Sequence, residues 1–132
     1  METLDEYIAS ATLMILGEDL DPSKVTGWLE LQPSQSWRTG EEKEMAPGSF
    51  HEWGGWKCFS EKSDETLEEK VESWLMRLQG REEEFSKMNS LGWRCSLDCF
   101  LAFDSVASLS ISPELARRVS ELGLTINICL NN

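Results

Sequence analysis

The sequence contains little of the chemistry on which most enzyme sites depend. His51 is the only histidine among 132 residues, and no His or Cys stands at a metal-ligand spacing from it. Neither a G-x-S-x-G nucleophile motif nor a G-x-x-x-x-G-K-S/T phosphate loop occurs. Two weaker alternatives remain open, a thiol site at Cys58 beside His51 and a cation site at Glu18, Asp19 and Asp21. We therefore predict a protein that is not an enzyme and needs no metal or cofactor.

Basic residues are also scarce. The chain has 12 Lys and Arg against 24 Asp and Glu, which gives a formal charge of −12. A field of this sign repels nucleic acid and anionic membranes and attracts basic proteins, although it is also a common means of staying soluble. The longest apolar run, residues 11–16, is too short to span a bilayer, and residues 1–6 lack the basic start of a signal peptide. We expect a cytoplasmic protein with no nucleic-acid or membrane partner.

The four cysteines form no C-x-x-C pair. Cys95 and Cys99 fall on one face of a predicted strand, about 13 Å apart, which is too far for a disulfide. Cys58 and Cys129 also lie in apolar or strand-like runs. The pattern predicts four buried free thiols, as suits a reducing compartment.

The apolar periodicity predicts one domain over residues 1–132. Two helix starts are marked by an N-cap followed by proline, at Asp21-Pro22 and Ser112-Pro113, and Gly123 is placed to end the second of these helices. The expected elements are strand 7–16, a helix from residue 22, strands 36–39 and 56–60, helix 66–88, strand 93–103, a helix from residue 113 and strand 124–130. This order favours an α+β fold with a single mixed or mostly antiparallel sheet of about five strands and helices packed on one face.

The irregular middle of the chain is the most promising binding surface. A mobile loop is expected before residue 50, and Trp37, Trp53 and Trp56 cluster around it. Such aromatics either pack a loop down or anchor an interface, and nearby carboxylates suit a charged docking surface. The acids that follow, towards and along the helix from residue 66, form either a second part of that surface or an ordinary solvated face. The predicted interface comprises Trp37, Glu41, Glu42, Glu44, Glu52, Trp53, Glu61, Asp64, Glu65 and Glu68.

Several segments taken together resemble a bacterial family known as domain of unknown function 4279. They are residues 17–22, 31–33, 36–40, 54–56 and 111–115, in that order. The resemblance implies no enzyme activity or cofactor. Members of the family are similar, in size and setting, to the small cytosolic immunity proteins of bacterial toxin systems. The resemblance therefore implies a cognate protein toxin with a basic surface as the partner.

Two functions remain as hypotheses. The first is an immunity protein that covers the active site of a toxin with its acidic surface. The second is a small-ligand-binding protein or enzyme, whose site residues would be Glu18, Asp19, Arg38, His51 and Trp56. A deep pocket that gathers these five groups would favour the second hypothesis. Self-association through an edge strand is a third possibility.

Overall fold

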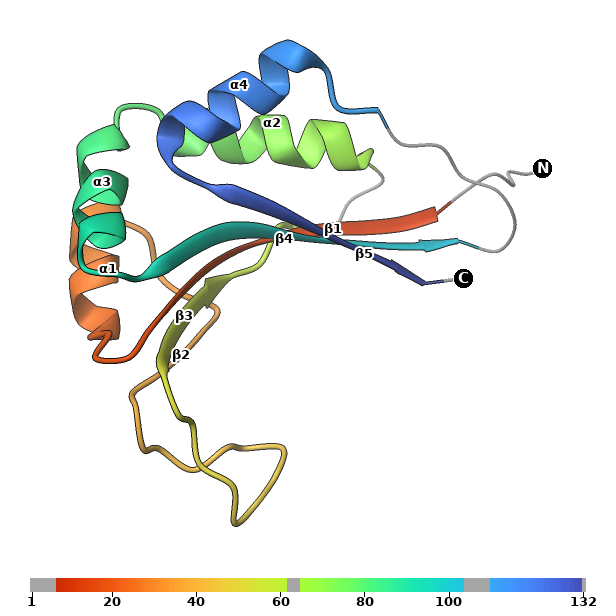
Figure 1. The fold of residues 1–132 in the computed structure, drawn as a ribbon. Coiled ribbons are helices and arrows are strands. Elements are labelled where there is room, and N and C mark those ends of the chain that lie inside the picture. Colours follow the sequence, from red (N-terminus) through yellow and green to blue (C-terminus); the bar gives the residue numbers. More distant parts are fainter. Residues whose placement is uncertain (1–6, 62–64, 104–109, 132) are drawn as a thin grey trace.

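The computed structural model describes residues 7–61, 65–103 and 110–131, which form one mixed five-stranded sheet with helices (Figure 1). The strands are β1 (Tyr7–Gly17), β2 (Gln35–Trp37), β3 (Gly54–Cys58), β4 (Arg94–Phe103) and β5 (Thr125–Asn131). The helices are α1 (Pro22–Leu29), α2 (Leu67–Arg77), α3 (Glu82–Ser90) and α4 (Pro113–Leu122). The strand order is β2-β3-β1-β4-β5, with only β4 and β5 parallel to each other. The predicted α+β class and mixed sheet are confirmed.

Strands β1 and β4 form the centre of the sheet because both bury one whole face. Ala11, Leu13 and Ile15 of β1 are fully buried, and their partners across the antiparallel pair, among them Leu97 and Cys95, are buried too. The residues between them, Thr12, Met14 and Leu16 in β1, are only half-buried. Alternation with a period of two thus separates a helix-covered face from an open face.

The starts of three helices follow from local capping. The Asp21 side chain accepts from the backbone N–H of Ser23 at 3.1 Å and begins α1. Thr66 and Glu69 form a reciprocal capping box at α2, and the Ser112 hydroxyl accepts from the N–H of Leu115 at α4. These caps satisfy backbone donors that a helix start leaves unpaired, which confirms the two predicted N-caps with proline.

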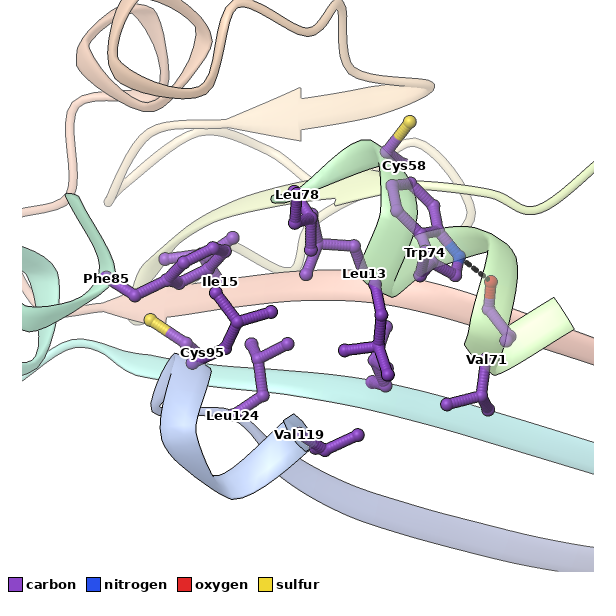
Figure 2. Close-up of a cluster of buried hydrophobic side chains, with 14 of the residues drawn as sticks. Leu13, Ile15, Cys58, Val71, Trp74, Leu78, Phe85, Cys95, Val119 and Leu124 are labelled. Atoms are coloured by element: carbon purple, nitrogen blue, oxygen red, sulfur yellow. Dashed lines mark hydrogen bonds between the residues drawn. The ribbon is translucent and has the colours of Figure 1, made fainter. Parts of the chain in front are cut away.

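The core lies between the buried face of the sheet and the helices (Figure 2). Val71 and Trp74 of α2 and its C-cap Leu78 pack there with Leu13 and Ile15 of β1. The Trp74 indole Nε1 donates to the Ala11 carbonyl at 2.8 Å, so this large side chain is buried without losing its hydrogen bond. The predicted one-sided helix packing is present over the centre of the sheet, where Figure 1 shows α2 and α4 on the same side.

The single helix expected over residues 66–88 is wrong: two helices, α2 and α3, occupy this segment. Gly80 between them has φ of +86°, a left-handed conformation that ends a helix and that L side chains rarely adopt. The turn redirects the chain so that Phe85 and Met88 of α3 enter the core beside the start of β4. Apolar spacing continued through the break because both helices bury residues in the same core, and for this reason periodicity alone did not reveal it.

Other sequence expectations also need correction. Strand β3 begins at Gly54, two residues before the predicted start, and β2 ends at Trp37. The thiols of Cys58, Cys95 and Cys99 are buried as expected, but Cys129 is exposed. Cys129 lies on the open face of β5, the edge strand of the sheet, with Thr125 and Asn127, so the expected burial of its thiol is wrong.

Candidate functional site

The strands β2 and β3 continue beyond the sheet into an irregular hairpin, residues 38–53, which we call the acidic hairpin. Its two sides are joined by backbone hydrogen bonds of 2.8 Å from Gly40 to His51, from His51 to Glu41 and from Lys43 to Ser49. Figure 1 shows that it projects away from the sheet on the side opposite to α2 and α4. The loop that the sequence predicted is thus a hydrogen-bonded element carried by two strands; its mobility stays a prediction.

Trp37 fastens the acidic hairpin to the sheet. Trp37 lies opposite Gly55 across the β2–β3 pair, and its ring covers that glycine so closely that a Cβ there would lie 2.1 Å from a ring carbon. The indole Nε1 donates to the Trp53 carbonyl at 3.0 Å. The His51 ring stacks on the indole with centroids 4.6 Å apart and planes 17° from parallel. The aromatic group proposed as an interface anchor therefore makes the intramolecular contacts of a structural anchor.

Further contacts brace the hairpin at its base. The Arg94 guanidinium of β4 lies over the Trp53 ring, 4.9 Å from its centroid. Arg38 forms an ion pair of 3.0 Å with Asp21, next to a hydrogen bond from the Thr39 hydroxyl to the chain before α1. The Ser23 hydroxyl, which donates to Asp21 at 2.8 Å, lowers the pKa of this carboxyl, and Arg38 lowers it further. The Asp21 carboxylate thus caps a helix and holds the hairpin base at once.

The outer part of the hairpin presents four exposed carboxylates, namely Glu41, Glu42, Glu44 and Glu52. Lys43 is the only lysine or arginine between residues 39 and 53. Glu42 has an internal role as well, because its carboxylate accepts from the Gly48 N–H at 2.7 Å. The structure thus gathers these four predicted residues on one projecting element.

Two apolar side chains of the same hairpin were missed by the sequence reasoning. Met45 is 93% exposed and Phe50 is 57% exposed, so both stand among the carboxylates in solvent. Exposed aromatic and Met side chains are enriched at protein interfaces. The signal for them was present in the sequence, since both break a run of otherwise polar and small residues.

The other predicted interface residues lie elsewhere. Glu65 and Glu68 lie at the start of α2, and the backbone carbonyl of Glu61 accepts from Lys70 of that helix, while Asp64 lies outside the described residues. The Glu68 carboxylate accepts from the Ser110 N–H at 3.0 Å. Figure 1 places this region and the acidic hairpin on opposite sides of the sheet. The predicted interface is therefore two separate acidic groups, and no single flat partner surface covers both.

The five residues of the alternative small-ligand site do not converge. Trp56 is fully buried on the helix side, where its Nε1 donates to the Thr26 hydroxyl of α1 at 3.0 Å. His51 stacks on Trp37, which covers Gly55 on the opposite face of the same strand. Glu18 and Asp19 are exposed in the turn after β1. Adjacent residues of a strand point to opposite faces, so Trp56 cannot line a site with His51.

A separate hollow of about 400 Å³ lies on the open face of the sheet, and none of these five residues lines it. Asp98 forms part of its wall and accepts from the Ser96 hydroxyl at 2.8 Å and from the Asn127 amide at 3.0 Å. Met14 and Leu16 add apolar surface. Asp98, Ser96 and Asn127 are thus hydrogen-bonded to one another within this wall.

The buried thiols of β4 are not activated as nucleophiles. Burial raises the pKa of Cys95 to about 12, and burial together with the Asp98 charge raises that of Cys99 to about 11, so both are neutral thiols at ordinary pH. Within the described part of the chain, no three His, Cys, Asp or Glu side chains are grouped as metal ligands. Nor does any described helix combine the length and apolar character needed to cross a membrane.

Comparison with known proteins gives one match. The family model for a domain of unknown function, DUF4279, matches residues 5–132. Neither a curated protein nor a solved structure matches the chain. Since the match covers nearly all of the sequence, the chain belongs to this family.

Proposed function

We propose that this member of the DUF4279 family is a cytoplasmic immunity protein that binds a cognate bacterial toxin and covers its active site. The acidic hairpin is the docking element in this proposal. Its exposed carboxylates meet basic residues of the toxin, and Met45 and Phe50 supply apolar contact between them. Toxins that act on nucleic acid carry basic surfaces, which is the charge pattern that an acidic inhibitor fits.

The observation that carries the proposal is the construction of the hairpin. Four exposed carboxylates and two exposed apolar side chains stand on one element, and that element is held at its base by Trp37, Trp53 and Arg94. A docking element held in place before binding loses less conformational entropy when it binds. An ordinary solubilising surface needs charge but does not need such an anchor.

Electrostatics adds a kinetic argument. A partner with a basic site is drawn towards the −12 chain, which raises the association rate by about 10- to 1,000-fold over an uncharged pair. Rapid capture suits a protein that must neutralise a toxin before the toxin reaches its substrate. The same mechanism requires that association slows as salt screens the charges.

The test is a pair of variants that remove equal charge from two places. Glu41, Glu44 and Glu52 are changed to Gln in one variant, while Glu42 is kept because it closes the hairpin turn. The control changes Glu82, Glu83 and Glu121 to Gln, three exposed carboxylates on α3 and α4. Both variants carry a formal charge of −9, from −12 less three acids, so they differ only in where the charge was removed.

Each variant is co-expressed with any toxin encoded next to it, and association is followed by surface plasmon resonance at several salt concentrations. We expect the hairpin variant to associate at least about tenfold more slowly than the control variant and to protect cells poorly. If the association rate fell equally in both variants, the hairpin would contribute only through the net charge of the protein. Absence of any complex between the wild type and every neighbouring toxin would sink the proposal.

A further inference from the structure

The two outermost strands of the sheet differ in how they meet solvent, and β5 is the one left open. It is an edge strand, and among the described residues β4 is its only strand partner. An unpaired edge presents a row of backbone N–H and C=O groups that another strand can complete. Proteins that stay monomeric usually protect such an edge with charged side chains, proline or a bulge.

β5 has none of these protections. From Leu122 to Asn132 the sequence contains no charged side chain and no proline, although more than a quarter of the whole chain is charged. All seven residues of the strand pair in unbroken register with β4, so no bulge turns the edge away. This uncharged edge stands out because the rest of the acidic surface would repel an identical copy.

The exposed apolar side chains of the molecule include two on this strand. Ile128 is 42% exposed and Leu130 is 62% exposed, whereas Leu124, which directly precedes the strand, is buried. The helix-side face of β5 is thus covered at its beginning and uncovered towards its end. Both exposed residues lie on the face that elsewhere in the sheet packs against helices.

We propose that β5 pairs antiparallel with β5 of a second copy of this chain and joins two sheets into one ten-stranded sheet. The sequence of the strand is self-complementary in this arrangement. With the two-fold axis at Ile128, Ile126 of one copy faces Leu130 of the other, and Asn127 faces Cys129. Apolar residues therefore meet apolar residues on one face, and polar or small residues meet on the other.

A second copy fits this edge better than a charged partner does. A basic partner gains nothing from a strand without carboxylates, and such a partner has the acidic hairpin at the opposite edge. Two copies, by contrast, meet where neither carries a charged side chain. The contact is isologous and closes on itself, because pairing consumes the long open edge that β5 gives each copy.

The dimer and the toxin complex have opposite salt dependences. Two copies at −12 repel each other at long range, so added salt strengthens their association, while it weakens a complex of opposite charges. Paired strands of seven residues cover less than the roughly 800 Å² per partner of a standard interface, so we expect a dimer that dissociates on dilution. The β5 contact leaves both acidic hairpins free, and a dimer would carry two docking elements.

Sedimentation velocity over a wide range of protein concentration, at low and high salt, tests this proposal on the full chain. We expect a reversible monomer–dimer equilibrium that shifts towards dimer as salt rises. Leu130→Lys should remain monomeric at every concentration, because it places like charges within one paired edge. Met76→Lys is the matched control, since Met76 is 67% exposed on α2 and is not part of β5, and it should dimerise as the wild type does.

Thr125→Lys is the second edge variant, because Thr125 is an exposed polar residue of the same strand. The folding of each variant is verified by circular dichroism. Hydrogen exchange adds a direct measurement, because β5 amides should become protected as protein concentration rises. A wild type that is monomeric throughout overturns the proposal, as does a dimer that both edge variants retain. Protection of β5 only in the presence of a toxin likewise overturns it. Toxin inhibition by Leu130→Lys stays intact on either outcome, so the two proposals fail separately.

Discussion

The two edges of the sheet both present unpaired backbone groups to solvent, but they differ in how far they prevent pairing with another strand. The β2 edge is a strand of three residues, and the chain leaves it through Arg38 into a hairpin that carries four exposed carboxylates. The β5 edge is a strand of seven residues without a charged side chain. One edge is shortened and surrounded by charge, which discourages strand pairing, while the other retains what pairing needs.

The difference teaches that net charge says little about where a protein binds. A charge of −12 describes the whole molecule, but exposed acids lie on the hairpin and on helices α2, α3 and α4, while β5 carries none. The β5 edge carries no charged side chain. A single acidic chain can therefore offer one surface to a basic partner and a different surface to its own copy.

The largest expected effect is at the base of the β2 edge, in Gly55→Ala. The new Cβ would lie 2.1 Å from the Trp37 ring, so the ring must leave the strand, and its stacking with His51 and its hydrogen bond to Trp53 are lost with it. We expect a loss of about 3 kcal/mol in the free energy of unfolding, measured by urea denaturation. Gly27→Ala, with open space around it in α1, is the control and should instead stabilise the protein by about 0.5–1 kcal/mol. Equal behaviour of the two variants would refute the anchor.

The next effect is a loss of folding stability at alkaline pH, caused by the buried thiols of β4 in the interior of the sheet. The unfolded chain loses thiol protons above pH 9.0, whereas folded Cys95 and Cys99 keep theirs because their pKa values are raised to about 12 and about 11. The unfolded state then binds fewer protons, so stability is fully present below pH 9 and falls as pH rises towards 11–12. At pH 10 we expect a loss of about 1.4 kcal/mol for each thiol.

Urea denaturation at pH 8, 9 and 10 measures this slope. Cys95→Ala should make this slope shallower, because it removes one of the two thiols whose pKa is raised by burial. A slope that does not respond to Cys95→Ala would assign the alkaline loss to other groups.

A smaller effect tests the hydrogen bond that closes the hairpin base. Trp37→Phe keeps an aromatic side chain at this position but removes the indole N–H that donates to the Trp53 carbonyl. We expect a loss of about 1 kcal/mol and faster hydrogen exchange at the His51 and Ser49 amides of the hairpin. Trp28→Phe is the control, because the Trp28 indole lies against Trp93, at 5.9 Å between ring centroids, and it should leave hairpin exchange as it is. Unchanged hairpin exchange in Trp37→Phe would show that ring stacking alone holds the element.

The smallest effect on stability is expected at the β5 edge itself. Leu130→Lys alters a side chain that is already 62% exposed, so the monomer should change by no more than about 0.5 kcal/mol in thermal denaturation. Self-association is nevertheless predicted to disappear. A large loss of monomer stability would mean that Leu130 belongs to the core, so that β5 does not present an open apolar edge.

Local signals in the sequence were sufficient for most of the fold. The Asp21 and Ser112 caps, the Gly123 stop and the alternation of β1 and β4 depend on neighbours within a few residues, so they were readable in advance. The break at Gly80 was not, because helical spacing of apolar residues persists across it. Of the predicted interface, four carboxylates lie on one hairpin, and the exposed Met45 and Phe50 beside them were missed.

The sequence by itself determined the charge, the helix caps, the two faces of each strand and the family. The tertiary structure alone decided which strands stand at the edges, that Trp37 turns inward onto Gly55, and that the predicted acids form two groups on opposite sides of the sheet. Strand order and ring placement depend on contacts between residues far apart in the chain. Burial of a shared face selects those contacts, and no local pattern encodes them.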